Sequence, residues 1–183
     1  MAEHDVIDLL MAQHGQIRDL FDEVEKAPPD KVDGAFARLT RMLSVHETAE
    51  EEIVHPYARR KLDNGQGVVG DRLREENHAK RLLLDLDRNG VDHPRFWERL
   101  AELRTVVTMH ARGEERYEFA RLRACTSAAE RRAMAAAVRA AETLAPVRPH
   151  PGTESAVKNV LLGTPMAVMD RAREVIRKAL GKR

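Results

Sequence analysis

The chain has 183 residues, of which 43% are hydrophobic, 33% charged and only 4% aromatic, and its formal net charge is +1. This length fits one domain with an extension, and the composition is typical of a soluble helical protein. The net charge says little about partners, and we expect no nucleic-acid partner. The single cysteine excludes an internal disulfide.

The start of the chain, residues 1–5, lacks both the basic segment and the apolar core of a signal peptide. No apolar run approaches the length of a transmembrane helix. The lone Cys125 suits a reducing compartment. We therefore expect a cytoplasmic protein with no membrane partner.

Apolar residues at three- and four-residue spacing predict four long helices, over residues 7–24, 31–62, 71–88 and 94–122. Proline, glycine and aspartate mark the turns between them. Pro56 is expected to kink the second helix rather than end it. Since short turns join antiparallel neighbours, the sequence predicts an all-α, up-down-up-down four-helix bundle.

Two further elements follow the bundle. The capping-box pattern at 127–130 opens a short fifth helix that ends near Leu144. Alternating prolines at 145–153 predict an extended linker, and Thr164-Pro165 opens a basic, amphipathic C-terminal helix. We therefore divide the chain into a bundle with its extra helix, 1–145, and an extension, 146–183. Packing on the bundle or against a second copy in a homodimer is the favoured role of this extension. A membrane-surface or nucleic-acid contact is the alternative, which the missing aromatics and the diffuse basic cluster disfavour.

Four histidines recur at intervals of 32 residues, at His14, His46, His78 and His110. The midpoint of each gap lies in or beside a predicted turn, so each helix carries one histidine at the same height, roughly 24 Å from the turns. Imidazoles that converge inside a bundle predict a metal site. The other histidines are expected outside it, and His55, nine residues after His46, falls on nearly the opposite face of an α-helix.

Two of these histidines have a carboxylate one helical turn later, in the pairs His46–Glu50 and His110–Glu114. Four residues turn an α-helix by about 400°, so both members of a pair face the same side. The two pairs are 64 residues apart, which indicates that the first two helices repeat as the second two. Such pseudo-two-fold placement of histidine and carboxylate predicts two metal ions joined by a bridge.

Imidazole and carboxylate donors without thiolate suit iron, manganese or zinc, and a dinuclear site of this composition suits six-coordinate iron better than zinc. Tyr117 lies seven residues after His110, on the same predicted face, as an additional ligand or a hydrogen-bond donor to the ligands. Glu51 and Glu115 are expected in solvent. Apolar residues around the layer would exclude water and admit a small neutral molecule.

These motifs, within residues 4–122, resemble the hemerythrin-like, or HHE cation-binding, family. The resemblance implies a four-helix bundle with two non-haem iron ions, joined by an oxo or carboxylate bridge. It also implies ligand roles for His14, His46, Glu50, His78, His110 and Glu114. Glu47 would be a further bridging carboxylate.

The chain departs from the oxygen-carrying members of this family. They have a second histidine on the third helix, one turn from the first, but the positions one turn from His78 are Arg74 and Leu82 in this chain. Their fourth helix has an aspartate five residues after its histidine, whereas Glu114 follows His110 by four. The resemblance therefore implies a protein that binds or reacts with dioxygen, peroxide or nitric oxide rather than a plain carrier. Three functions stay open: an enzyme that turns over peroxide or nitric oxide, a sensor of iron or oxygen without turnover, and a bundle with a structural zinc ion or no metal.

Overall fold

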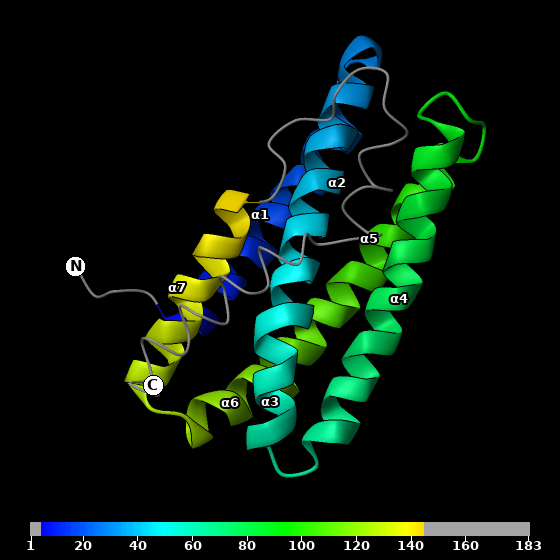
Figure 1. The fold of residues 1–183 in the computed structure, drawn as a ribbon. Coiled ribbons are helices and arrows are strands. Elements are labelled where there is room, and N and C mark those ends of the chain that lie inside the picture. Colours follow the sequence, from blue (N-terminus) through cyan, green and yellow to red (C-terminus); the bar gives the residue numbers. More distant parts are fainter. Residues whose placement is uncertain (1–4, 145–183) are drawn as a thin grey trace.

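The computed structural model describes residues 5–144, which form helices and no strand (Figure 1). The four rods of the bundle begin with α1 (Val6–Lys26), α2 (Val32–Ala49), α4 (Gly65–Asn89) and α5 (Phe96–Gly113). A short 3₁₀ turn, η1 (Pro29–Lys31), joins the first two, and α7 (Ala128–Leu144) packs beside α1. The predicted all-α bundle with a fifth helix is confirmed.

The second and fourth rods each contain a π-helical turn. The second runs from α2 through η2 (Glu50–Val54) into α3 (His55–Lys61), and the fourth runs from α5 through η3 (Glu114–Phe119) into α6 (Ala120–Cys125). Both π turns begin at the glutamate of a His-x-x-x-Glu pair, 64 residues apart. Internal symmetry therefore extends from the sequence motif to the backbone.

A π turn changes which side chains face the bundle interior. It places one more residue in the turn than an α-helix does, so every later residue is rotated by about 100° relative to α-helical expectation. In the second rod, Pro56 has no N–H to donate to Glu52, which favours the loss of α-helical bonding there. The kink predicted at this proline is thus a π turn just before it.

The ends of the helices follow local rules. The Asp5 side chain accepts hydrogen bonds from the backbone N–H groups of Ile7 and Asp8, at 3.0 and 3.2 Å, and so caps α1. The capping box predicted for α7 is present, with the Glu130 N–H donating to Ser127 Oγ at 3.2 Å. These caps satisfy backbone groups that the first turn leaves free.

Two apolar clusters fill the bundle, one on each side of a polar layer. The upper cluster packs Phe21, Phe36, Phe96 and their neighbours between α1, α2, α4 and α5. The lower cluster joins the start of α1 to η2, α3, α6 and α7, and Met134 is among its fully buried members. Apolar packing above and below holds the polar layer rigidly and away from water.

The linker and basic helix predicted for 146–183 lie outside the described residues. Among residues 5–144, no helix is both long and apolar enough to cross a membrane.

Candidate metal centre

The polar layer is a cluster of histidines and glutamates buried between the two apolar clusters. Each member is at most 7% exposed: His14, His46, Glu50, His55, Glu76, His110 and Glu114. They come from all four rods, so folding alone brings them together. Ligand atoms of His14, His46, Glu50 and Glu114 lie within 4.8 Å of one another, and so do those of Glu50, His55, Glu76 and Glu114.

The two groups share Glu50 and Glu114, whose carboxylates lie at the centre. His14 Nε2 is 3.3 Å from one Glu114 oxygen, and His46 Nε2 is 3.3 Å from Glu50. His110 Nε2 reaches both carboxylates, at 3.3 Å from Glu114 and 3.9 Å from Glu50. Two carboxylates that lie between two sets of nitrogen donors are placed to bridge two cations.

The second group adds donors that α4 and α3 supply. His55 Nε2 is 2.5 Å from Glu76 and 4.0 Å from Glu114, and His110 Nε2 is 3.9 Å from Glu76. His55 Nδ1 is 3.0 Å from Glu118, a fully buried carboxylate of η3. This side of the cluster therefore holds two imidazoles and a third carboxylate.

All four buried imidazoles are oriented in the same way, with Nε2 inward and Nδ1 outward. The Nδ1 atoms of His14, His55 and His110 lie 2.9, 3.0 and 3.1 Å from carboxylate oxygens of Glu115, Glu118 and Glu75. An anionic acceptor fixes the proton on Nδ1 and leaves the Nε2 lone pair facing the centre. This is the orientation that a metal-binding histidine requires.

His46 has an amide as its outer partner. Its Nδ1 donates to Gln13 Oε1 at 2.8 Å, and Gln13 in turn donates through Nε2 to Glu142 on α7. The carboxylate of Glu142 thereby fixes which end of the Gln13 amide faces the histidine. Helix α7 thus completes the support of one imidazole.

Several buried atoms of the cluster have no hydrogen-bond partner among the described residues. They are His14 Nε2, His110 Nε2, both oxygens of Glu50, both oxygens of Glu114 and one oxygen each of Glu76 and Glu118. A buried polar atom without a partner costs free energy, so an orphaned set of this size in one place is rare. Cations between these atoms would satisfy all of them at once, and the donor set fits hard or borderline metals such as iron.

Burial and neighbouring charges oppose one another in the cluster. Burial, together with the Glu114 charge, raises the pKa of Glu50 to about 7, whereas burial and the positive charge of His14 lower the pKa of His46 to about 3. Although burial disfavours their charged forms, contacts with carboxylates raise the pKa values of His55 and His110 well above the usual value. These opposed pKa shifts favour protons between the imidazoles and carboxylates of the metal-free layer, and metal binding would release such protons.

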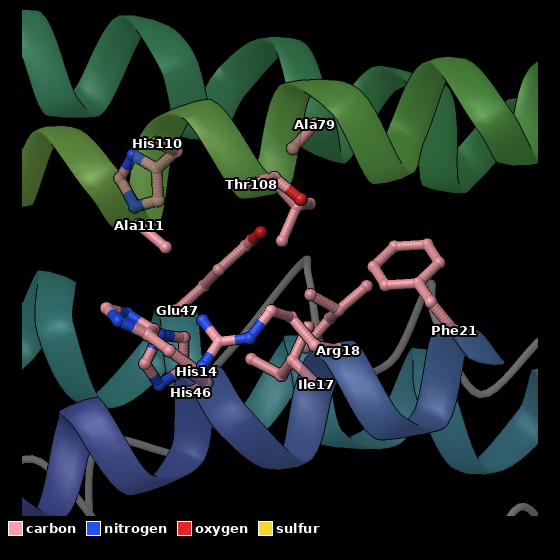
Figure 2. A pocket seen from close by; sticks show the side chains of 12 residues that line it. His14, Ile17, Arg18, Phe21, His46, Glu47, Ala79, Thr108, His110 and Ala111 are labelled. Carbon is pink, nitrogen blue, oxygen red and sulfur yellow. The ribbon is translucent and has the colours of Figure 1, made fainter. Parts of the chain in front are cut away.

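A narrow cavity of about 20 Å³ opens beside the cluster. Ile17, Phe21, Leu43 and Val107 are among its apolar lining residues. Figure 2 shows the Glu47 side chain reaching across this space toward the helix that carries His110. The volume admits about one water-sized molecule, which restricts access to a diatomic or similarly small ligand.

The structure corrects the position expected for His78. Its side chain is 47% exposed, and its nearest ionic partner is Glu102 at 4.0 Å, outside the cluster. The buried stripe of α4 includes Val69, Glu76 and Ala79. His78 lies two residues after Glu76, hence about 200° round the helix, on the opposite face. Equal spacing from turns predicted its height along the bundle but not its direction.

The two residues proposed as additional donors also lie elsewhere. Tyr117 is 51% exposed, because the π turn η3 rotates it away from the face of His110, and the Arg116 guanidinium lies 5.4 Å from its ring centroid. Glu47 is 5% exposed and lies at the cavity rather than between the imidazoles. Burial raises the pKa of Glu47 to about 8.

Sequence reasoning missed His55, Glu76 and Glu118. The π turns rotate His55 and Glu118 inward, and no α-helical count could place them there. Glu76 did carry a signal, since it occupies the three-and-four-spaced buried stripe of α4. Glu115, expected in solvent, instead accepts the hydrogen bond from His14.

Comparisons with known proteins point to a domain family. A family model described as the hemerythrin HHE cation binding domain matches residues 5–122, which cover the four rods but not α7. A DNA nickase from Nostoc sp. is 30% identical over 117 residues, which are 63% of this chain and 33% of that protein. The chain thus spans about a third of the length of this curated relative. No solved structure matches the chain significantly.

Proposed function

Because the chain belongs to the hemerythrin HHE cation-binding family, we propose that its buried cluster holds two iron ions and binds or reacts with a small oxidant. Dioxygen, peroxide and nitric oxide fit the narrow apolar cavity beside the cluster. The observation that carries the proposal is the common orientation of the four imidazoles, each with Nε2 facing a cluster in which all oxygens of Glu50 and Glu114 lack hydrogen-bond partners.

The proposed ligand set differs from the one that the sequence motifs suggest. His14 and His46 would hold one ion, and His55 and His110, with Glu76, the other. Glu50 and Glu114 would bridge them, as the motif pairs predict. His78 and Tyr117 would have no part in this set.

Each part of the protein contributes differently to the proposed reaction. The outer carboxylates orient the imidazoles, and the apolar clusters exclude water. Glu47 is a buried carboxyl at the cavity, placed to hold a proton beside a bound ligand. Bound iron would supply the electron-transfer chemistry that imidazole and carboxylate side chains lack.

Metal analysis and the optical spectrum of aerobically purified protein test the proposal. We expect about two iron ions per chain and a near-ultraviolet absorption band, as in other bundle-core di-iron proteins. Peroxide and nitric oxide assays then measure turnover. Protein that contains only zinc, or that takes up no iron on reconstitution, would contradict the redox proposal.

A second candidate function, sensing without turnover, is favoured by the contact between His46, Gln13 and Glu142. This contact joins the cluster to α7, the helix beyond the family match. A sensor would show iron-dependent hydrogen exchange in α7 and no consumption of peroxide. An enzyme would consume peroxide with little change in α7.

A further inference from the structure

A second, polar pocket lies at the lower end of the bundle, away from the candidate metal centre. Its volume is about 410 Å³, and it is formed by the first turns of α4 together with η3 and α6. The lining contains three arginines, one exposed tyrosine and a single acidic residue: Arg72, Arg74, Arg121, Tyr117 and Asp71. We propose that this pocket binds the phosphate group of a nucleotide-sized ligand.

The charge of the pocket favours an anion. Asp71 is paired with Arg74 and Glu75 with Arg72, so Arg121 is the arginine of the pocket whose charge no described acid neutralises. Arg121 is exposed, and no described residue is its hydrogen-bond or ionic partner. Arginine presents a planar set of donors that matches phosphate oxygens, and such paired contacts are stronger than those between neutral groups.

Arg72 supplies a positive charge that folding has already fixed in place. It is 9% exposed, and its Nη2 donates to Glu75 at 2.9 Å. Its Nε and Nη1 atoms have no acceptor among the described residues. A Cβ added to Gly113 would lie 1.6 Å from Arg72 Nη1, so the guanidinium packs directly against Gly113 and would have to move if a larger residue stood there.

The backbone at the pocket rim also favours a negative charge. Helix α4 is 25 residues long and begins here, after Asn64 in the left-handed conformation. The Asn64 side chain makes no capping hydrogen bond, and the first turn of α4 contains no acid. The N–H groups of Gly65, Gly67 and Val68 already donate to the backbone carbonyls of Leu62 and Asn64, so the helix start contributes a favourable potential for an anion rather than free donors. Gly67 and Gly70 leave the wall free of bulky side chains.

Tyr117 gives the pocket a place for the rest of the ligand. Its ring is half exposed beside the arginines, and a base or another flat group could stack on it. The volume exceeds what a bare phosphate needs and approaches that of small-molecule sites. A nucleoside monophosphate fits both observations better than an inorganic ion does.

Isothermal titration of the full chain with inorganic phosphate, adenosine monophosphate and a 5′-phosphorylated oligonucleotide tests the proposal. We expect Arg121→Gln to weaken binding of the monophosphate about tenfold, the loss typical of one charge-assisted contact. Arg88→Gln is the matched control, because Arg88 is an exposed arginine near the other end of α4. It should leave the affinity unchanged.

The three ligands distinguish the sources of the phosphate. Tighter binding of the monophosphate than of phosphate, reduced by Tyr117→Ala, supports a nucleotide ligand. Equal affinities support a site for free phosphate, and a preference for the oligonucleotide that requires Arg121 supports a strand end. Equal weakening by Arg121→Gln and Arg88→Gln, or no binding of any ligand at millimolar concentration, would overturn the proposal. Arg72 joins this pocket to the metal cluster, because Glu75 contacts both Arg72 and His110 Nδ1. The titrations are therefore made on metal-free and on iron-loaded protein, and Arg121→Gln should weaken binding in both forms.

Discussion

Among residues 5–144, four histidines are buried at the centre of the bundle: His14, His46, His55 and His110. His55 takes the place that periodicity gave to His78. The difference is decided at the level of single side chains. His55 has one imidazole nitrogen facing Glu118 and the other facing Glu76, whereas His78 faces solvent.

Substitution of these two histidines tests the proposed ligand set. We expect His55→Ala to lower the bound iron from about two ions to about one per chain, because it removes an inward-facing nitrogen. His78→Ala is the matched control and should keep the iron content, with a stability change within about 0.5 kcal/mol. Metal analysis after reconstitution measures both. Iron loss in His78→Ala but not in His55→Ala would contradict the assignment.

Support of the ligands by outer partners is also a property of single residues. Glu142 acts on His46 only through Gln13, whose amide it orients. Removing the carboxylate lets this amide turn over and present its NH₂ group to the imidazole. Outer partners of metal-bound histidines typically change metal affinity by 10- to 100-fold.

We therefore expect Glu142→Ala to weaken iron binding about tenfold and to change the absorption spectrum of the loaded protein. Glu142→Gln can still accept the Gln13 hydrogen bond and should restore most of the affinity. Competition with a chelator measures the affinity, while thermal unfolding of the metal-free variants reports any effect on folding. An equal loss of iron affinity in both variants would contradict this role, because it would show that Glu142 acts through its charge and not by orienting the Gln13 amide.

At the scale of the helices, α7 is attached to the bundle by apolar packing and by polar contacts at both of its ends. Met134 and Val138 are fully buried in the lower cluster. Near its start, Arg131 Nε donates to Asp5 at 2.6 Å, so the residue that caps α1 also holds α7. Near its end, Glu142 contacts Gln13. One helix outside the family domain thus contacts both the start of α1 and the support of the centre.

The pair of Asp5 and Arg131 predicts a pH dependence of stability. Although burial opposes the charge, the hydrogen bond and charge of Arg131 and the backbone N–H groups lower the pKa of Asp5. A carboxylate with a lowered pKa in the folded state stabilises the protein above its unfolded pKa, and this contribution is lost as the pH falls through the folded pKa.

Asp5→Asn keeps the cap and removes the charge, so it should destabilise the metal-free protein by about 1 kcal/mol at neutral pH. The difference from the unsubstituted protein should disappear at acid pH, once Asp5 is protonated. Urea unfolding at both pH values measures it. A difference that is the same at both values would show that the charge contributes nothing.

At the scale of the whole molecule, the bundle consists of two apolar clusters that flank a layer of ionisable groups. Each cluster gains free energy from burial, and the layer loses free energy wherever a polar atom has no partner. The stability of the folded protein should therefore depend on what occupies the layer.

Removal of metal with a chelator should lower the midpoint of thermal unfolding by roughly 10 °C. This shift corresponds to a free metal concentration about a hundredfold above the Kd in the loaded sample. The loss should be smaller in His55→Ala, which is expected to bind fewer ions. Differential scanning calorimetry of loaded and stripped protein measures the shift. Identical midpoints for the two forms would indicate that the layer holds no metal in solution.

The sequence by itself determined the helical bundle, its turns and the pairs His46–Glu50 and His110–Glu114, because these depend on local spacing within regular α-helices. Only the tertiary structure decided which other residues join them. The two π turns rotate His55 and Glu118 inward and Tyr117 outward, and the buried stripe of α4 selects Glu76 over His78. A count along an ideal helix fixes the height of a side chain, but packing and the local helical pitch fix the direction in which it points.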